Sequence, residues 1–190
     1  MHPFRAFIEQ YHPISDEVWQ EAESYLERME ATPGTLLVKE GKTCKHLFFL
    51  EQGLLRFFVW RKGVDVTKFF TVAPYSFTSL QSFSNQEPAL ENVDALEDSV
   101  IWRMKREDAY RLLERPEWAA FVRELTQQVQ GYTENILEAL QNQTAEERYR
   151  NLLENQGDLL QRVPLKYLAS YLGITPQSLS RIRKKVVLDR

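Results

Sequence analysis

The first half of the chain alternates short apolar runs with glycine-containing turns, from about Thr35 to Thr71. The runs recur at close to ten-residue spacing, which is typical of strands in an antiparallel barrel or roll. A further alternating segment, residues 90–102, indicates more strand. The pattern predicts an N-terminal antiparallel β-roll, a double-stranded β-helix. The four runs of the first series are residues 36–38, 47–50, 54–59 and 64–70.

After Met104 the apolar spacing changes to three and four residues, which indicates helices. Residues 105–113 predict a short helix that stops near Pro116, and residues 118–141 predict a long one. The long segment carries an apolar stripe with the spacing of a coiled-coil seam. Either two copies of the chain meet along this stripe, or the helix packs on its own barrel. The predicted dimer-seam residues are Val122, Leu125, Val129, Tyr132 and Ile136.

Three more helices are predicted in the C-terminal quarter. Thr144 and Glu147 have the spacing of a capping box, which starts a helix that ends near residues 155–157. Residues 165–172 form the next helix, and Gly173 ends it. Thr175 is a favourable N-cap for the last helix, and Pro176 suits its first position.

The last two predicted helices fit a helix-turn-helix. Ala169 lies where the two helices cross closely, and Gly173 lies in the turn, where a positive φ is expected. In this geometry the last helix enters the major groove of DNA with its N-terminal residues toward the base edges. An ordinary pair of amphipathic helices is the alternative. The shared core of the motif consists of Leu168, Leu172, Ile174, Leu179 and Ile182.

The outward side chains of the last helix are candidates for reading DNA. Gln177 can pair with adenine, and Arg181 can pair bidentately with guanine. Lys166, Thr175 and Lys184 can hold phosphates. Alternatively, the basic cluster is a solvated helix end that complements the helix dipole. The candidate DNA-binding residues are Lys166, Thr175, Gln177, Ser178, Arg181, Arg183, Lys184 and Lys185.

The charge of the chain separates along the same division. The 190 residues include 24 Lys and Arg and 27 Asp and Glu, a formal net charge of −3. Residues 145–190 hold nine basic and five acidic side chains, a net charge of +4, so the other 144 residues carry −7. A basic segment on an acidic body is the pattern of an electrostatic DNA footprint in a two-domain chain.

The order of roll, long helix and helix-turn-helix resembles the Crp/Fnr superfamily of bacterial transcription regulators. The most specific segment is residues 164–183, PLKYLASYLGITPQSLSRIR, which looks like the helix-turn-helix of Bacteroidetes-type members. Residues 39–41 and 51–56 resemble turn signatures of the cyclic-nucleotide-binding-like domain. The implied fold class is α+β, with a roll and flanking helices over residues 1–117, a dimerisation helix over 118–143 and a DNA-binding domain over 144–190.

The resemblance implies a homodimer whose rolls bear on a central helix pair and whose two recognition helices read a palindromic operator in double-stranded DNA. RNA polymerase is a further candidate partner. Family members continue into a winged-helix hairpin after the recognition helix. Only four residues follow Val186, so the wing is expected to be absent.

The roll departs from the family pattern at its ligand site. Cyclic-nucleotide-binding members carry a Gly-Glu-Leu triplet and a later Arg-Ser or Arg-Thr pair, where this chain has residues 78–80 and 89–90. A buried phosphate without a cation costs several kcal/mol, so cyclic AMP is not expected to bind in the usual way and the effector is unidentified. Either a more neutral ligand binds or the roll senses nothing. The candidate effector-pocket residues are Ser79, Leu80, Gln81, Ser82, Ala89 and Leu90.

The sequence excludes several other classes of protein. The one cysteine, Cys44, excludes a disulfide framework, a four-cysteine iron–sulfur cluster and a cysteine zinc site. The three histidines offer no closely spaced pair for a cupin-type metal site, and no nucleophile–base set is evident, so neither a metal, a cofactor nor catalytic residues are expected. The chain has no apolar run of membrane-spanning length and no signal-peptide pattern, which predicts a cytoplasmic protein without membrane contact. The remaining alternative is a ligand-binding or interaction protein with a degenerate DNA-binding domain.

Overall fold

The computed structural model describes residues 1–188. The chain forms two compact units, of which the first holds residues 1–57 and 70–130, and the second holds residues 58–69 together with the chain from residue 131 onward. The long helix α5 (Pro116–Asn142) and the strands β4 (Leu54–Arg61) and β5 (Val64–Val72) therefore contribute to both units.

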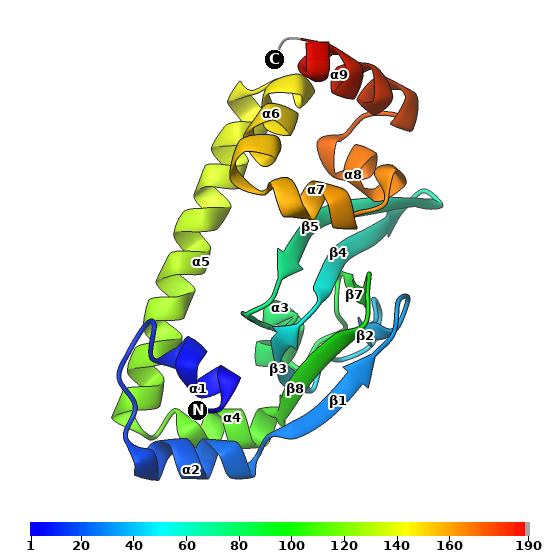
Figure 1. Ribbon diagram of the computed structural model, residues 1–190. Helices are drawn as coiled ribbons and strands as arrows, with labels where there is room; N and C mark the ends of the chain where they lie inside the picture. The colour runs from blue at the N-terminus through cyan, green and yellow to red at the C-terminus, as the bar shows by residue number, and fades with distance from the viewer. Residues whose placement is uncertain (189–190) are drawn as a thin grey trace. The chain divides into compact units, whose positions relative to one another are not determined.

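Two four-stranded sheets form the β-roll, and the elements are labelled in Figure 1. The strand order is β1-β8-β3-β6 in one sheet and β2-β7-β4-β5 in the other. The pairings β1–β8, β3–β8, β3–β6 and β2–β7 are all antiparallel. The predicted antiparallel roll is thus confirmed. The remaining strands are β1 (Glu27–Ala31), β2 (Leu36–Val38), β3 (His46–Gln52), β6 (Tyr75–Phe77), β7 (Asn92–Ala95) and β8 (Ser99–Lys105).

The predicted strand runs agree with β2, β3, β4 and β5. The segment at residues 90–102 contains β7 and the first part of β8, which continues to Lys105. Sequence reasoning missed β1, because three of its five residues, ERMEA, are charged and exposed and the strand shows no apolar run. It also missed β6, which is only three residues long. Both strands form because they pair with neighbouring strands in the sheet, and their own sequences show no strand pattern.

Helices pack against the roll and share an aromatic core with it. Phe4 of α1 stacks on Phe49 of β3 with ring centroids 4.6 Å apart, and Trp118 and Phe121 of α5 close the same cluster. The predicted short helix is present as α4, and α5 begins with Pro116 at its first position, where proline is tolerated. The helices of this unit besides α5 are α1 (Pro3–Ile8), α2 (Asp16–Ser24), α3 (Leu80–Asn85) and α4 (Arg106–Leu112).

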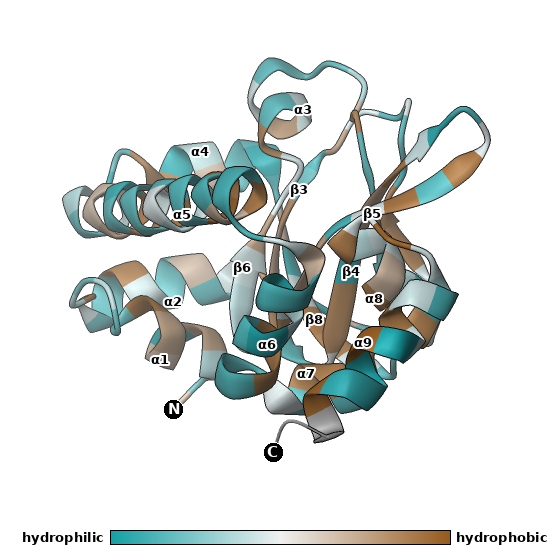
Figure 2. Cartoon of the chain, turned by 90° about the horizontal axis from the view of Figure 1, so that it is seen from above, coloured by the Kyte–Doolittle hydropathy of each residue, from teal (hydrophilic) through white to brown (hydrophobic). Residues whose placement is uncertain are grey.

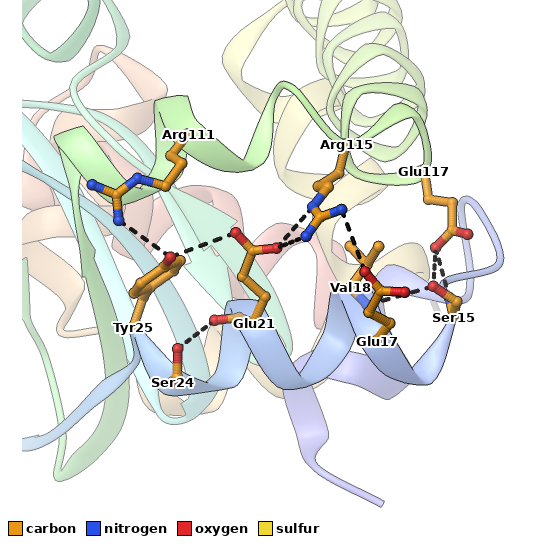
Figure 3. Close-up of polar contacts among 9 residues, drawn as sticks. All are labelled: Ser15, Glu17, Val18, Glu21, Ser24, Tyr25, Arg111, Arg115 and Glu117. Atoms are coloured by element: carbon orange, nitrogen blue, oxygen red, sulfur yellow. Dashed lines mark hydrogen bonds and ion pairs between the residues drawn. The ribbon is translucent and has the colours of Figure 1, made fainter.

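Polar contacts join α2 to the segment between α4 and α5 (Figure 3). Arg115 donates to the Glu21 carboxylate at 2.7–2.8 Å. Glu117 accepts hydrogen bonds from the backbone N–H and the hydroxyl of Ser15 at 2.7 and 2.8 Å, and these bonds lower the pKa of the Glu117 carboxyl. Exposed pairs of this kind each contribute little stability, but together they fix where α5 begins.

The second unit contains four helices after α5 among its described residues: α6 (Ala145–Asn155), α7 (Gly157–Arg162), α8 (Leu165–Leu172) and α9 (Pro176–Leu188). The predicted capping box is confirmed, since Glu147 N–H donates to the Thr144 hydroxyl at 3.2 Å and Thr144 N–H donates to the Glu147 carboxylate at 2.7 Å. Sequence reasoning missed α7, because Gly157 is predicted to end a helix and instead begins one. The prediction that no wing follows α9 depends on residues 189–190, which lie outside the described part of the chain.

Within the described part of the chain, no group of three or more His, Cys, Asp or Glu side chains could hold a metal ion. No described helix is long and apolar enough to cross a lipid bilayer.

Candidate nucleic-acid interface

A three-residue turn joins α8 to α9. Gly173 ends α8 in the left-handed conformation, with φ 70° and ψ 27°, as the sequence predicts. The Thr175 hydroxyl accepts a hydrogen bond from the Ser178 N–H at 3.1 Å. Thr175 is therefore the N-cap of α9, as predicted. The turn therefore holds the first residues of α9 in a defined position. Ala169, at the predicted crossing, is fully buried. Three of the five predicted core residues, Leu168, Leu172 and Leu179, are also buried, whereas Ile174 and Ile182 are partly buried.

The outer face of α9 is exposed and basic. Gln177, Arg181 and Lys184 follow three-four spacing, so they lie on one face of the helix, and all three are exposed. On the other side of the helix Leu179 and Val186 are buried. Figure 2 shows hydrophilic and hydrophobic positions alternating along α9. The structure thus places the two predicted base-reading residues, Gln177 and Arg181, on one exposed helix face with the predicted phosphate contact Lys184.

The remaining candidate residues differ in how far they are available to a ligand. Lys166 and Arg183 are exposed. Thr175 and Ser178 are engaged with each other, because their hydroxyls lie 3.0 Å apart and Thr175 caps the helix. Each hydroxyl can therefore bind a phosphate only through a donor or acceptor position that this contact leaves unused.

Lys185 is paired with a residue of α6. Its Nζ lies 2.9 Å from the Glu146 carboxylate, which also contacts Arg150 at 3.0 Å. Hydrogen bonds from Lys185 and, to a lesser extent, from Arg150 lower the pKa of the Glu146 carboxyl. An exposed ion pair of this kind contributes little stability, so a phosphate group can displace the carboxylate from Lys185.

Arg148 of α6 has a structural role. Its Nη2 donates to the carbonyl oxygen of Leu172, the last residue of α8, at 2.7 Å. The guanidinium thereby satisfies a carbonyl at the helix end that has no partner within the helix. One of the nine basic charges counted in the C-terminal segment thus stabilises the turn and is not available to a ligand.

The predicted seam on α5 divides into two parts. Val122 and Leu125 are partly buried against the aromatic core of the first unit. Val129 and Tyr132 are exposed by 39% and 49%, and Ile136 is half-buried. Leu137 and Leu140, in the same part of the helix, are also exposed and were not among the predicted seam residues. The first part of the stripe therefore packs on its own chain, and the second part presents apolar side chains to solvent.

The candidate effector residues are only partly brought together. Ser79 is buried, and its hydroxyl donates to the Glu91 carboxylate at 2.8 Å. The buried Ser82 hydroxyl accepts from Cys44 N–H at 2.8 Å and donates to the Glu87 carbonyl, so the fold already uses it. Leu80 and Leu90 are exposed, as is Gln81, whereas Ala89 is buried. Sequence reasoning missed Glu91, which comes directly after the positions compared with the family pattern.

A buried ion pair lies inside the roll and was not predicted. Arg56 of β4 is 2% exposed, and Asp94 of the neighbouring strand β7 is 7% exposed. Arg56 Nε lies 3.0 Å from Asp94 Oδ1, and Nη2 lies 2.9 Å from Oδ2, which is bidentate geometry. The sequence signal was a charged residue, Arg56, inside an apolar run of β4 and a second one, Asp94, between Val93 and Ala95 of β7.

Comparison with known proteins agrees with this architecture. Residues 28–116 match the family model of the cyclic nucleotide-binding domain. Among curated proteins no sequence matches this chain significantly. A putative transcriptional regulator of the Crp/Fnr family from Eubacterium rectale superimposes with a TM-score of 0.69 at 14% identity, over 95% of this chain and 88% of that one. The chain has the Crp/Fnr fold.

Two other solved structures illustrate the extent of the Crp/Fnr likeness. The c-di-GMP responsive global regulator CLP of Xanthomonas campestris has a TM-score of 0.70 at 12% identity, with 92% of this chain and 93% of that one covered. The catabolite activator protein of Thermus thermophilus has a TM-score of 0.58 at 20% identity, with 94% and 86% covered. The fold predicted from the order of the elements is thus confirmed over nearly the whole chain.

Proposed function

We propose that the protein is a homodimeric, sequence-specific DNA-binding transcriptional regulator of the Crp/Fnr type, acting in the cytoplasm, and is not an enzyme. The observation that carries this proposal is the exposed row of Gln177, Arg181 and Lys184 on α9, beside the buried contacts that fix α9 to α8. The solved structures with this fold include a catabolite activator and a global regulator, which supports the same role.

In the proposed complex, α8 and α9 act as a helix-turn-helix, and α9 lies in the major groove. Arg181 donates two hydrogen bonds to a guanine, and Gln177 pairs with an adenine. Lys166 and Lys184 contact phosphates, which position the helix but carry no sequence information. Arg148 holds the end of α8 and so maintains the angle at which α9 is presented.

Selection of bound duplexes from a randomised library tests this proposal. We expect enrichment of a palindromic site whose half-sites lie about one helical turn, ~34–36 Å, apart. Selection with and without a metabolite extract shows whether an effector is needed. Absence of enrichment at low salt under both conditions would refute DNA recognition and favour a ligand-binding or interaction protein.

The exposed part of the α5 stripe is proposed as the dimer seam. Replacing Tyr132 with glutamate places a charge in the apolar contact, and we expect the dimer dissociation constant to rise at least about tenfold, equivalent to about 1.4 kcal/mol. Leu113→Glu is the matched control, because Leu113 is also exposed but lies outside the stripe. Light scattering at micromolar concentration measures both. A monomeric wild-type protein, or equal dissociation constants for the two variants, would contradict this assignment.

Cyclic AMP is proposed not to be the effector. The Glu91 carboxylate, which accepts from the Ser79 hydroxyl at 2.8 Å, directly follows residues 89–90, where cyclic-nucleotide-binding members carry their arginine, and a carboxylate repels a phosphate. We expect calorimetric titration with cyclic AMP to give no saturable heat. A micromolar dissociation constant would overturn this prediction.

A different ligand at the roll is proposed to act by changing how the α5 seams pack. That change would alter the spacing of the two recognition helices.

A further inference from the structure

The outer part of the β4–β5 hairpin, residues 58–69, belongs to the same compact unit as α6–α9. One hydroxyl group fixes it to α8. Thr67 N–H donates to Ser170 Oγ at 3.0 Å, and Ser170 Oγ donates to the carbonyl oxygen of Asp65 at 3.2 Å. Ser170 thus satisfies two backbone groups of β5, so the hairpin and the first helix of the proposed DNA-binding motif are held together.

The hairpin carries the same sign of charge as the C-terminal helices. Arg61, Lys62 and Lys68 are exposed, and Asp65, the only acidic residue in the segment 58–69, is half-buried. The hairpin segment is therefore +2 and residues 145–190 are +4. The rest of the chain holds 12 basic and 21 acidic side chains, a net charge of −9. Both of these basic segments lie in the second unit, whereas the rest of the chain is acidic on balance.

The attachment point of the hairpin places it beside a proposed phosphate contact. Ser170 follows Lys166 by four residues on α8, so the two side chains lie on one face of the helix, about 6 Å apart along its axis. The hairpin tip also presents Trp60 and Val64 to solvent, with exposed fractions of 53% and 60%. Exposed basic side chains beside an exposed aromatic ring are suited to contact with a polyanion. They are not suited to packing inside the roll.

We propose that the β4–β5 hairpin is part of the DNA-binding surface, where Arg61 and Lys62 contact phosphates on the side of α8 that carries Lys166. This inference rests on the proposed function. The sensor roll, through the outer part of one of its hairpins, thereby supplies sequence-independent affinity, while α9 supplies sequence preference.

Salt dependence of DNA binding tests the proposal. We expect the variant Arg61→Gln/Lys62→Gln to reduce the slope of log K against log salt concentration by about 0.9 for each phosphate that the variant no longer neutralises, or about 2 per protomer. A selected duplex and a base-shuffled duplex should lose affinity equally. The control is Lys39→Gln/Lys42→Gln, which removes the same charge from exposed positions in the first unit and should leave the slope nearly unchanged.

The outcomes separate the inference from the proposed function. If the hairpin variant and the control have the same slope while the wild-type protein binds its selected duplex, the hairpin proposal is wrong and the function stands. If the wild-type protein binds no duplex, the proposed function fails and the inference with it. Ser170→Ala gives a second test, because removing the attachment should weaken binding; tighter binding would mean that the hairpin restrains the DNA-binding helices, which overturns the proposal.

Discussion

Replacing Arg56 with methionine is expected to lower the free energy of unfolding by about 3–5 kcal/mol. The substitution leaves the Asp94 carboxylate, which is 7% exposed, without the two hydrogen bonds at 2.9 and 3.0 Å that Arg56 provides. Removing a charge from water costs free energy, which its ion-pair partner offsets in the folded protein. When the partner is removed, most of that cost remains. Urea denaturation followed by circular dichroism measures the change.

The double variant Arg56→Met/Asp94→Leu distinguishes this explanation from a simple packing effect. Because it removes both charges and keeps apolar volume between β4 and β7, we expect it to recover most of the lost stability. If the double variant is as unstable as the two single changes added together, the two residues are energetically independent and the explanation is wrong.

Replacing Arg181 with alanine is expected to weaken binding to the selected duplex by about 1–3 kcal/mol and to relax preference at one base pair in each half-site. The side chain is exposed on the face of α9 that also carries Gln177. A bidentate contact with a base edge discriminates among bases, so its removal changes which sequences bind as well as how tightly. Fluorescence anisotropy with duplexes that vary one base pair at a time measures both effects.

Lys184→Ala is the matched control, since it also removes one exposed positive charge from α9. A phosphate contact carries no sequence information, so this variant should bind all duplexes more weakly by a similar factor and lower the salt slope by about one per protomer. An Arg181→Ala variant that behaves in the same way would show that Arg181 contacts only phosphate.

Features that depend on neighbouring residues in the sequence could be predicted from the sequence. Thr144 and Glu147 are three residues apart and form their capping box within one helical turn. Gly173 has the left-handed conformation expected of a residue that ends a helix before a turn. The apolar runs of the roll were evident because strands buried in a sheet consist of consecutive β-favouring residues.

Features that depend on residues far apart in the sequence could not be predicted in this way. Arg56 pairs with Asp94 across two strands, and Ser170 bonds to a hairpin about a hundred residues earlier in the chain. The sequence shows each of these residues as an isolated polar group, because its partner is determined only by the tertiary fold. The effector region illustrates the same limit, since the sequence makes Ser82 a ligand candidate, whereas the fold engages its hydroxyl with Cys44 and Glu87.

The central claim is that α9 reads DNA sequence, and the ratio of two dissociation constants tests it most directly. The wild-type protein is titrated, at physiological ionic strength, with its selected palindromic duplex and with a duplex of the same composition in shuffled order. The proposed function predicts that the selected duplex binds at least about 10³-fold more tightly. Equal affinities for the two duplexes would contradict it, because the basic surface would then bind DNA only through its phosphates.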